Sequence, residues 1–238
     1  MIVVILSTGK SSRYKEHGFH RQKSMLPMPD ERILLAWQLD SITSMLEVGD
    51  TVLYISREDY REDEADDVEK AFNMQLPHFI NRQAYWLHGE LDGALDVMSQ
   101  IKPILLGYTY YQGHDDDDLL VMYNDEIIRY DQIARIREIG ADAVVASFFT
   151  EDERFTRIPN YPHGSLACGC TYWFLSIQDF YQLLKQTQLA KNMGFQILFI
   201  EQIIGLILSC WINIMLNLGQ QKNMLHGCLN LVIMRDGS

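Results

Sequence analysis

The chain has 238 residues, of which 47% are apolar and 22% are charged. These are ordinary values for a globular protein, and a chain of this length buries a sizeable core without disulfides or a structural metal. The formal net charge is -12, which predicts a surface that repels nucleic acid and anionic membranes. We therefore expect no nucleic-acid or membrane partner, and an anionic substrate has to be met by a local basic site or a bound cation.

The chain contains four cysteines in apolar contexts, which are Cys168, Cys170, Cys210 and Cys228. We interpret them as reduced core residues of a cytoplasmic protein, because they are few and form no disulfide framework. A zinc site is the alternative, although the spacing Cys168-x-Cys170 is tighter than a usual ligand pair.

Two apolar segments raise the question of membrane insertion. Met1 to Leu6 has no basic lead and no cleavage site, so it does not resemble a signal peptide. Phe195 to Leu216 approaches the length of a membrane span, but Glu201 interrupts it at a cost of roughly 2.5–3.5 kcal/mol. We expect core helices there, with a membrane-associated protein as the alternative.

The N-terminal half alternates apolar runs with helical patterns. Ile2 to Leu6 is a continuous apolar run, typical of a strand buried on both faces, and Thr51 to Ile55 is a second one. Between them, a turn at Pro29-Asp30 precedes apolar residues at helical spacing over Leu34 to Leu46. The charged stretch Glu58 to Ala71 indicates a solvated helix face or a mobile loop.

The alternation continues along the rest of the chain. Further strands are predicted from Phe79, at Leu119 to Tyr123, at Ala143 to Phe149 and at Cys170 to Leu175, and helices at Leu91 to Ile101, Ile127 to Ile139 and Ile177 to Leu189. Strands that alternate with helices indicate one α/β domain, residues 1–238, around a mostly parallel mixed sheet.

Small and basic residues follow the first predicted strand. Gly9-Lys-Ser11-Ser12-Arg13 lets backbone amides approach an anion, and Arg13 adds a forked donor suited to phosphate. Ten residues later, Lys23 supplies a mobile positive charge for a polyphosphate. This pattern indicates a phosphate site, with Arg13 and Lys23 as its cations.

The segment resembles the signature of sugar-1-phosphate nucleotidyltransferases, in which an apolar strand, a Gly-x-Gly-Thr-Arg-like loop and Pro-Lys-Pro-Leu-Leu-Pro-like residues follow one another. The matching segments here are Gly9 to Arg13 and Gln22-Lys23-Ser-Met-Leu-Pro27. The resemblance implies a three-layer, Rossmann-like fold and nucleotide contacts from Leu6, Ser7, Thr8, Gly9, Lys10, Ser11 and Ser12. Ser11 replaces the usual second glycine, so we expect backbone strain and a hydroxyl that crowds the pyrophosphate.

The strand that ends at Tyr123-Asn124-Asp125 resembles the family strand that ends in Gly-Asp. The resemblance implies that Asp125 binds Mg²⁺ and that Asn124 lies beside the nucleotide, in keeping with the place of ligands in α/β sheets. A helix N-cap is the alternative role for Asp125. Asp236 is the candidate second magnesium ligand.

Two looser matches complete the resemblance. Gly93 lies in a segment similar to the family's Gly-Thr-Ala-Gly-Ala-Leu, which implies a contact with the base, and a plain helix start is the alternative. Gly169 and Tyr172 lie in a segment similar to the strand that lines the sugar pocket, with a core strand as the alternative. The resemblance extends over about residues 1–180, and the chain diverges beyond them.

The resemblance implies transfer of a nucleoside monophosphate from an NTP to a sugar 1-phosphate, with Mg²⁺ as cofactor and pyrophosphate as product. A phosphocholine acceptor is a close alternative, for which Trp86 and Trp173 could face the choline cation. A non-catalytic nucleotide-binding regulator is a second alternative, favoured by Ser11 and Asn124. The sequence leaves the oligomeric state open, with a homo-oligomer among the options.

Overall fold

The structure of the chain, a computed structural model, describes residues 1–89, 91, 94–112, 117–125, 127, 143–149, 166–174, 176–192 and 230–234. The described strands form a seven-stranded sheet in the order β3-β2-β1-β4-β6-β5-β7. Their bounds are β1 Ile2–Ser7, β2 Thr51–Arg57, β3 Asn81–Leu87, β4 Leu119–Tyr123, β5 Ala143–Phe149, β6 Leu166–Phe174 and β7 Asn230–Met234.

The sheet has a parallel half and an antiparallel half. Strand β1 pairs in parallel with β2 and β4, and β2 pairs in parallel with β3. Beyond β4, the pairs β4–β6, β5–β6 and β5–β7 are all antiparallel. The predicted α/β class with a mixed sheet is confirmed, and β1 lies inside the parallel half.

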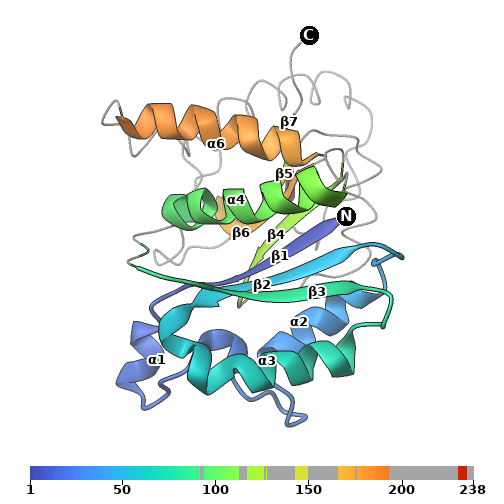
Figure 1. Cartoon of the computed structure of the whole chain (residues 1–238). Helices are drawn as coiled ribbons and strands as arrows, with labels where there is room; N and C mark the ends of the chain where they lie inside the picture. Colours follow the sequence, from blue (N-terminus) through green and yellow to red (C-terminus); the bar gives the residue numbers. More distant parts are fainter. Residues whose placement is uncertain are drawn as a thin grey trace, which may run out of the picture.

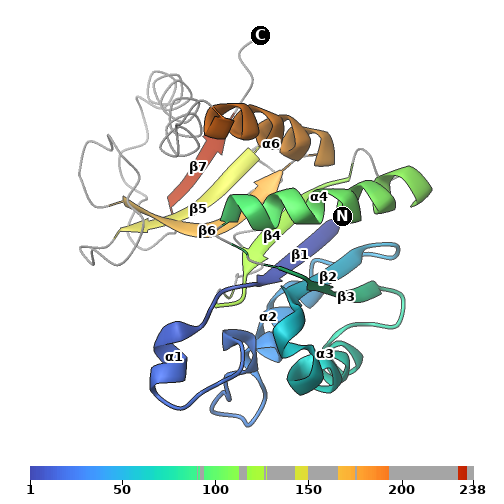
Figure 2. The same cartoon turned by 60° about the vertical axis from the view of Figure 1, so that its left-hand side comes forward.

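Helices cover both faces of the sheet and make three layers. The helical elements are α1 (Ser12–Glu16), η1 (Lys23–Met25), α2 (Leu34–Thr43), η2 (Glu58–Tyr60), α3 (Arg61–Gln75), α4 (Ala94–Gln112) and α6 (Ile177–Asn192). Helices α2 and α3 lie on one face, and α4 and α6 lie on the other (Figures 1 and 2). The predicted three-layer arrangement is therefore confirmed.

The two helical layers explain the apolar run of β1. Ile2, Val4 and Leu6 pack in a cluster with residues of α4 and α6, whereas Val3 and Ile5 pack in a second cluster with residues of α2 and α3. All five side chains are at most 1% exposed. Burial of one such side chain stabilises the fold by roughly 1.5–3 kcal/mol, so a polar residue in this strand would be costly.

Several predicted boundaries differ from the structure. Strand β3 begins at Asn81 rather than at Phe79, because a turn in which the Ile80 amide donates to the Pro77 carbonyl leaves Phe79 half exposed. Helix α2 ends at Thr43, and β6 spans Leu166–Phe174. The helix expected at Ile127 to Ile139 and the apolar segment Phe195 to Leu216 lie outside the described residues, apart from Ile127.

The charged segment after β2 is a helix with a solvated face, as the first of the two expectations had it, and not a loop. The helix also has a buried stripe that was not expected. Glu64, Val68 and Phe72 follow one another at four-residue spacing along α3, and all three are at most 1% exposed. Residues four apart share one helix face, which places a carboxyl group within the apolar stripe. Among the described helices, none is long and apolar enough to cross a membrane.

Candidate functional site

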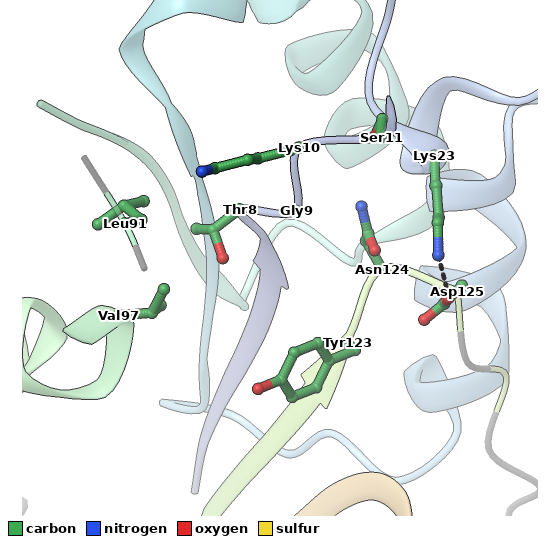
Figure 3. A pocket seen from close by; sticks show the side chains of 10 residues that line it. All are labelled: Thr8, Gly9, Lys10, Ser11, Lys23, Leu91, Val97, Tyr123, Asn124 and Asp125. Carbon is green, nitrogen blue, oxygen red and sulfur yellow. Dashed lines mark hydrogen bonds and ion pairs between the residues drawn. The ribbon is translucent and has the colours of Figure 1, made fainter. Parts of the chain in front are cut away.

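A pocket of about 420 Å³ opens at the edge of the sheet where β1 and β4 end. Leu6 and Tyr123 are paired in the sheet, and the backbone amide of Asn124 donates to the Leu6 carbonyl at 3.0 Å. The segments that follow the two strands therefore begin side by side. The carboxyl ends of parallel strands are where α/β sheets bind ligands. The pocket is lined by Thr8, Gly9, Lys10, Ser11, Lys23, Leu91, Val97, Tyr123, Asn124 and Asp125 (Figure 3).

Buried hydroxyl and amide groups join the segments beneath the pocket. The Ser7 hydroxyl lies 2.9 Å from the Ser24 hydroxyl and accepts a hydrogen bond of 2.9 Å from the side-chain amide of Asn124. The Ser24 hydroxyl also lies 2.8 Å from the Tyr54 hydroxyl. Burial raises the pKa of Tyr54, so its hydroxyl stays protonated in this network. The network fixes the end of β1, the turn η1 and the end of β4 relative to one another.

Ser11 has the left-handed backbone conformation that its place in the motif predicted. Its φ and ψ are 50° and 26°, and this conformation costs a non-glycine residue roughly 1–2 kcal/mol. The hydroxyl donates a hydrogen bond of 3.1 Å to the Gln22 side-chain oxygen. The expected strain is therefore present, and Ser11 lines the pocket with its hydroxyl hydrogen-bonded to Gln22.

Gln22 and Glu64 lie behind the loop, and the sequence interpretation missed both. The Gln22 side-chain amide donates to the Gly9 carbonyl at 2.9 Å, and the Gln22 backbone amide donates to Glu64 Oε1 at 2.7 Å. Both residues are fully buried. Desolvation by burial raises the pKa of Glu64 to about 7, although the Gln22 hydrogen bond acts in the opposite direction. For Glu64, the four-residue spacing from Val68 could have indicated that it lies on the buried face of the helix.

Lys23 and Asp125 meet at the mouth of the pocket. Lys23 begins η1, whose next two residues, Ser24 and Met25, are buried and hold the turn in place. Lys23 Nζ lies 2.6 Å from Asp125 Oδ2, and both side chains are partly exposed, at 31% and 46%. An ion pair at this exposure contributes roughly 0–1 kcal/mol, so its separation costs little.

Part of the pocket lining is apolar or aromatic and was not predicted. Leu91, Val97 and Tyr123 line the pocket, and Leu91 and Val97 belong to the cluster beneath α4. In Figure 3 the Lys10 side chain extends towards Leu91, whereas Lys23 lies beside Asp125. The pocket lining thus combines positively charged and apolar groups.

The remaining predicted site residues lie in several places. Leu6 is in the core, Ser7 is in the buried network and Ser12 is the exposed first residue of α1, so none of the three lines the pocket. Arg13 lies in α1 and Gly169 and Tyr172 lie in β6, but their side chains are outside the described part of the structure. Gly93 and Asp236 lie outside the described residues.

One of the two aromatic residues suggested for a choline cation packs elsewhere, and the side chain of the other, Trp173 in β6, is outside the described part of the structure. The Trp86 ring contacts Tyr54 with centroids 6.0 Å apart, and Trp86 packs against the cluster beneath α2 and α3. Leu91 and Val97 of the pocket wall belong to the opposite cluster. Trp86 is therefore not part of the described pocket wall.

The donor set near Asp125 fits magnesium only together with a ligand. No group of three or more metal-ligating side chains occurs within the residues that the structure describes. Asp125 offers a partly exposed carboxylate at the pocket, and magnesium commonly takes one or two carboxylates plus substrate phosphates and water. The described residues thus fit an ion that arrives with a polyphosphate.

Comparisons with solved structures agree with the fold. A nucleoside-diphosphate-sugar pyrophosphorylase from Vibrio cholerae RC9 is similar with a TM-score of 0.57 and 20% identity over 82% of each chain. A protein from Bacillus anthracis, assigned as a glucose-1-phosphate thymidylyltransferase, has a TM-score of 0.56 and 15% identity over 77% of this chain and 74% of its own. At this identity the likeness establishes the fold alone. Comparisons with protein-family models and with curated proteins find no match.

Proposed function

We propose that the protein transfers a nucleoside monophosphate from an NTP to a sugar 1-phosphate and releases pyrophosphate, with Mg²⁺ as cofactor. One observation carries this proposal. The loop after β1, Lys23 and Asp125 converge on one pocket at the carboxyl ends of two parallel strands. The solved structures with this fold include a nucleoside-diphosphate-sugar pyrophosphorylase, which supports the reaction class.

The reaction needs charge neutralisation and alignment rather than a protein nucleophile. A phosphate oxygen of the sugar 1-phosphate attacks the α-phosphorus of the NTP, and the bond from that phosphorus to the bridging oxygen of the pyrophosphate breaks. Charge spreads over the phosphate oxygens in the transition state, so nearby cations and fixed amides lower the barrier. Lys23 and the backbone of Gly9 to Ser11 line the pocket and can supply them.

The ion pair of Lys23 and Asp125 offers a positive charge for phosphate oxygens and a carboxylate for a metal ion. A bound magnesium ion would neutralise phosphate charge and would be held by Asp125. Lys23 then exchanges its carboxylate partner for a phosphate oxygen. Because the pair is partly exposed, this exchange of partners loses little free energy, and the new contacts are charge-assisted.

A two-stage experiment tests the proposal. A thermal-shift panel of NTPs with Mg²⁺ should identify a nucleotide that raises the melting temperature, since a ligand at 100 times its Kd stabilises by about 2.7 kcal/mol. Pyrophosphate release is then measured with that NTP and a panel of sugar 1-phosphates and phosphocholine. Lys23→Met should show a smaller shift in melting temperature and lose pyrophosphate release, and Lys70→Met, on the exposed face of α3, is the control for lost charge.

The panel separates the alternatives. Turnover with a sugar 1-phosphate supports the proposal, and turnover with phosphocholine alone changes the acceptor. Nucleotide binding without pyrophosphate release from any acceptor would instead identify a regulatory binding protein. The absence of any NTP-dependent shift would refute the proposal as a whole.

A further inference from the structure

The loop from Gly9 to Ser11 depends on a residue that does not itself line the pocket. A loop that binds a triphosphate has to hold its backbone in one conformation before the ligand arrives. Ser11 opposes this requirement, because its left-handed conformation, at φ 50°, is unfavourable for a residue with a side chain. Some other contact must therefore compensate within the fold.

Gln22 makes that contact from behind the loop. Its side-chain oxygen accepts from the Ser11 hydroxyl at 3.1 Å, and its side-chain nitrogen donates to the Gly9 carbonyl at 2.9 Å. One planar amide thus holds both ends of the three-residue loop. Because Gln22 and Ser11 are both buried, water does not compete well for the hydrogen bond between them, and loss of the glutamine would leave the Ser11 hydroxyl without this buried partner.

Gln22 is itself fixed by the body of the domain. Its backbone amide donates to Glu64 on α3 at 2.7 Å, and Glu64 shares the buried stripe of that helix with Val68. On the other side, the next residue of the chain is Lys23, at the mouth of the pocket. Gln22 therefore connects the loop, the lysine and the helical layer.

We propose that Gln22, anchored by Glu64, is the positioning residue that holds Ser11 in its left-handed conformation and so keeps the loop ready for a triphosphate. This inference rests on the proposed function for its ligand. It also accounts for the serine at this position, because the glutamine supplies by hydrogen bonding the conformational preference that a glycine would have by itself.

A mutant cycle between the two positions tests this proposal. The four proteins are wild type, Gln22→Ala, Ser11→Gly and the double variant, and Gln75→Ala, on α3 beside Arg32, is the matched control. Two quantities are measured: the Kd for inorganic triphosphate, and NMR order parameters of Gly9 to Ser12 in ligand-free protein. Rigid backbone gives order parameters of about 0.85 and flexible backbone gives values below about 0.6.

We expect Gln22→Ala to weaken triphosphate binding by at least about tenfold and to lower the order parameters of the loop. Ser11→Gly in the same chain should restore most of the affinity, because glycine adopts the left-handed conformation without strain. The proposal is overturned if Gln22→Ala has the same Kd and the same order parameters as Gln75→Ala. It is also overturned if the effects of Gln22→Ala and Ser11→Gly on the free energy of triphosphate binding are additive in the double variant. If Gln22→Ala does not fold, Gln22→Met retains the volume and serves in its place.

The two measurements also separate this proposal from the proposed function. A wild-type protein whose melting temperature no NTP raises refutes the function. The order parameters still decide whether Gln22 holds the loop, because they are recorded without ligand.

Discussion

The buried carboxyl group of Glu64 predicts a specific dependence of stability on pH. Its pKa rises from 4.5 to about 7 on folding, chiefly through desolvation, while Arg21 lowers it and Asp63 and Asp67 raise it. Between pH 4.5 and about 7, Glu64 therefore keeps its proton in the folded state but has released it in the unfolded state. The contribution of Glu64 to the free energy of unfolding is fully present below pH 4.5, and it decreases as the pH rises towards 7.

The magnitude follows from the same values. One pKa unit corresponds to 1.36 kcal/mol, so the full loss above pH 7 is about 3 kcal/mol, and about 2 kcal/mol of it falls between about pH 5.5 and 8. Glu64→Gln removes the titration but keeps a side-chain oxygen that can accept from the Gln22 amide. The difference in stability between Glu64→Gln and wild type should thus grow by about 2 kcal/mol over this range.

Urea unfolding of both proteins at several pH values measures this difference directly. Glu69→Gln removes a negative charge from an exposed position of the same helix and controls for the change in net charge. Parallel stability curves for wild type and Glu64→Gln would refute the reasoning, since they would mean that Glu64 carries the same charge in both states.

Three further predictions concern the pocket. Lys23→Met should leave unfolding unchanged within about 1 kcal/mol but weaken NTP binding roughly 10–100-fold, as titration calorimetry would detect. Asp125→Asn should abolish the gain in NTP affinity that Mg²⁺ gives wild type, and a retained gain would disprove the metal assignment. Gly9→Ala should fold normally, because its new Cβ meets nothing within 4 Å. It should nevertheless bind NTP more weakly, whereas an unchanged Kd would mean that no phosphate approaches Gly9.

Much of the site was predictable because strand ends are visible in the sequence. Apolar runs located β1 and β4, and the polar residues after them had to emerge at one edge of the sheet if the strands were parallel neighbours. Thr8 to Ser11, Lys23, Asn124 and Asp125 indeed line one pocket. Leu91, Val97 and Tyr123 were not predicted as lining, because an apolar residue on a wall and one in the core look alike in a sequence.

The sequence by itself determined the α/β class, the buried central strands and the small, polar loop after β1, because these depend on local periodicity and on residue type. Only the tertiary structure decided which groups meet over long separations. Lys23 and Asp125 are 102 residues apart, and Gln22 and Glu64 are 42 apart. No local pattern in the sequence predicts a contact between residues that are so far apart along the chain. Packing of the helical layers and register of the strands bring these groups together, and they place the Ser11 hydroxyl within hydrogen-bond distance of Gln22.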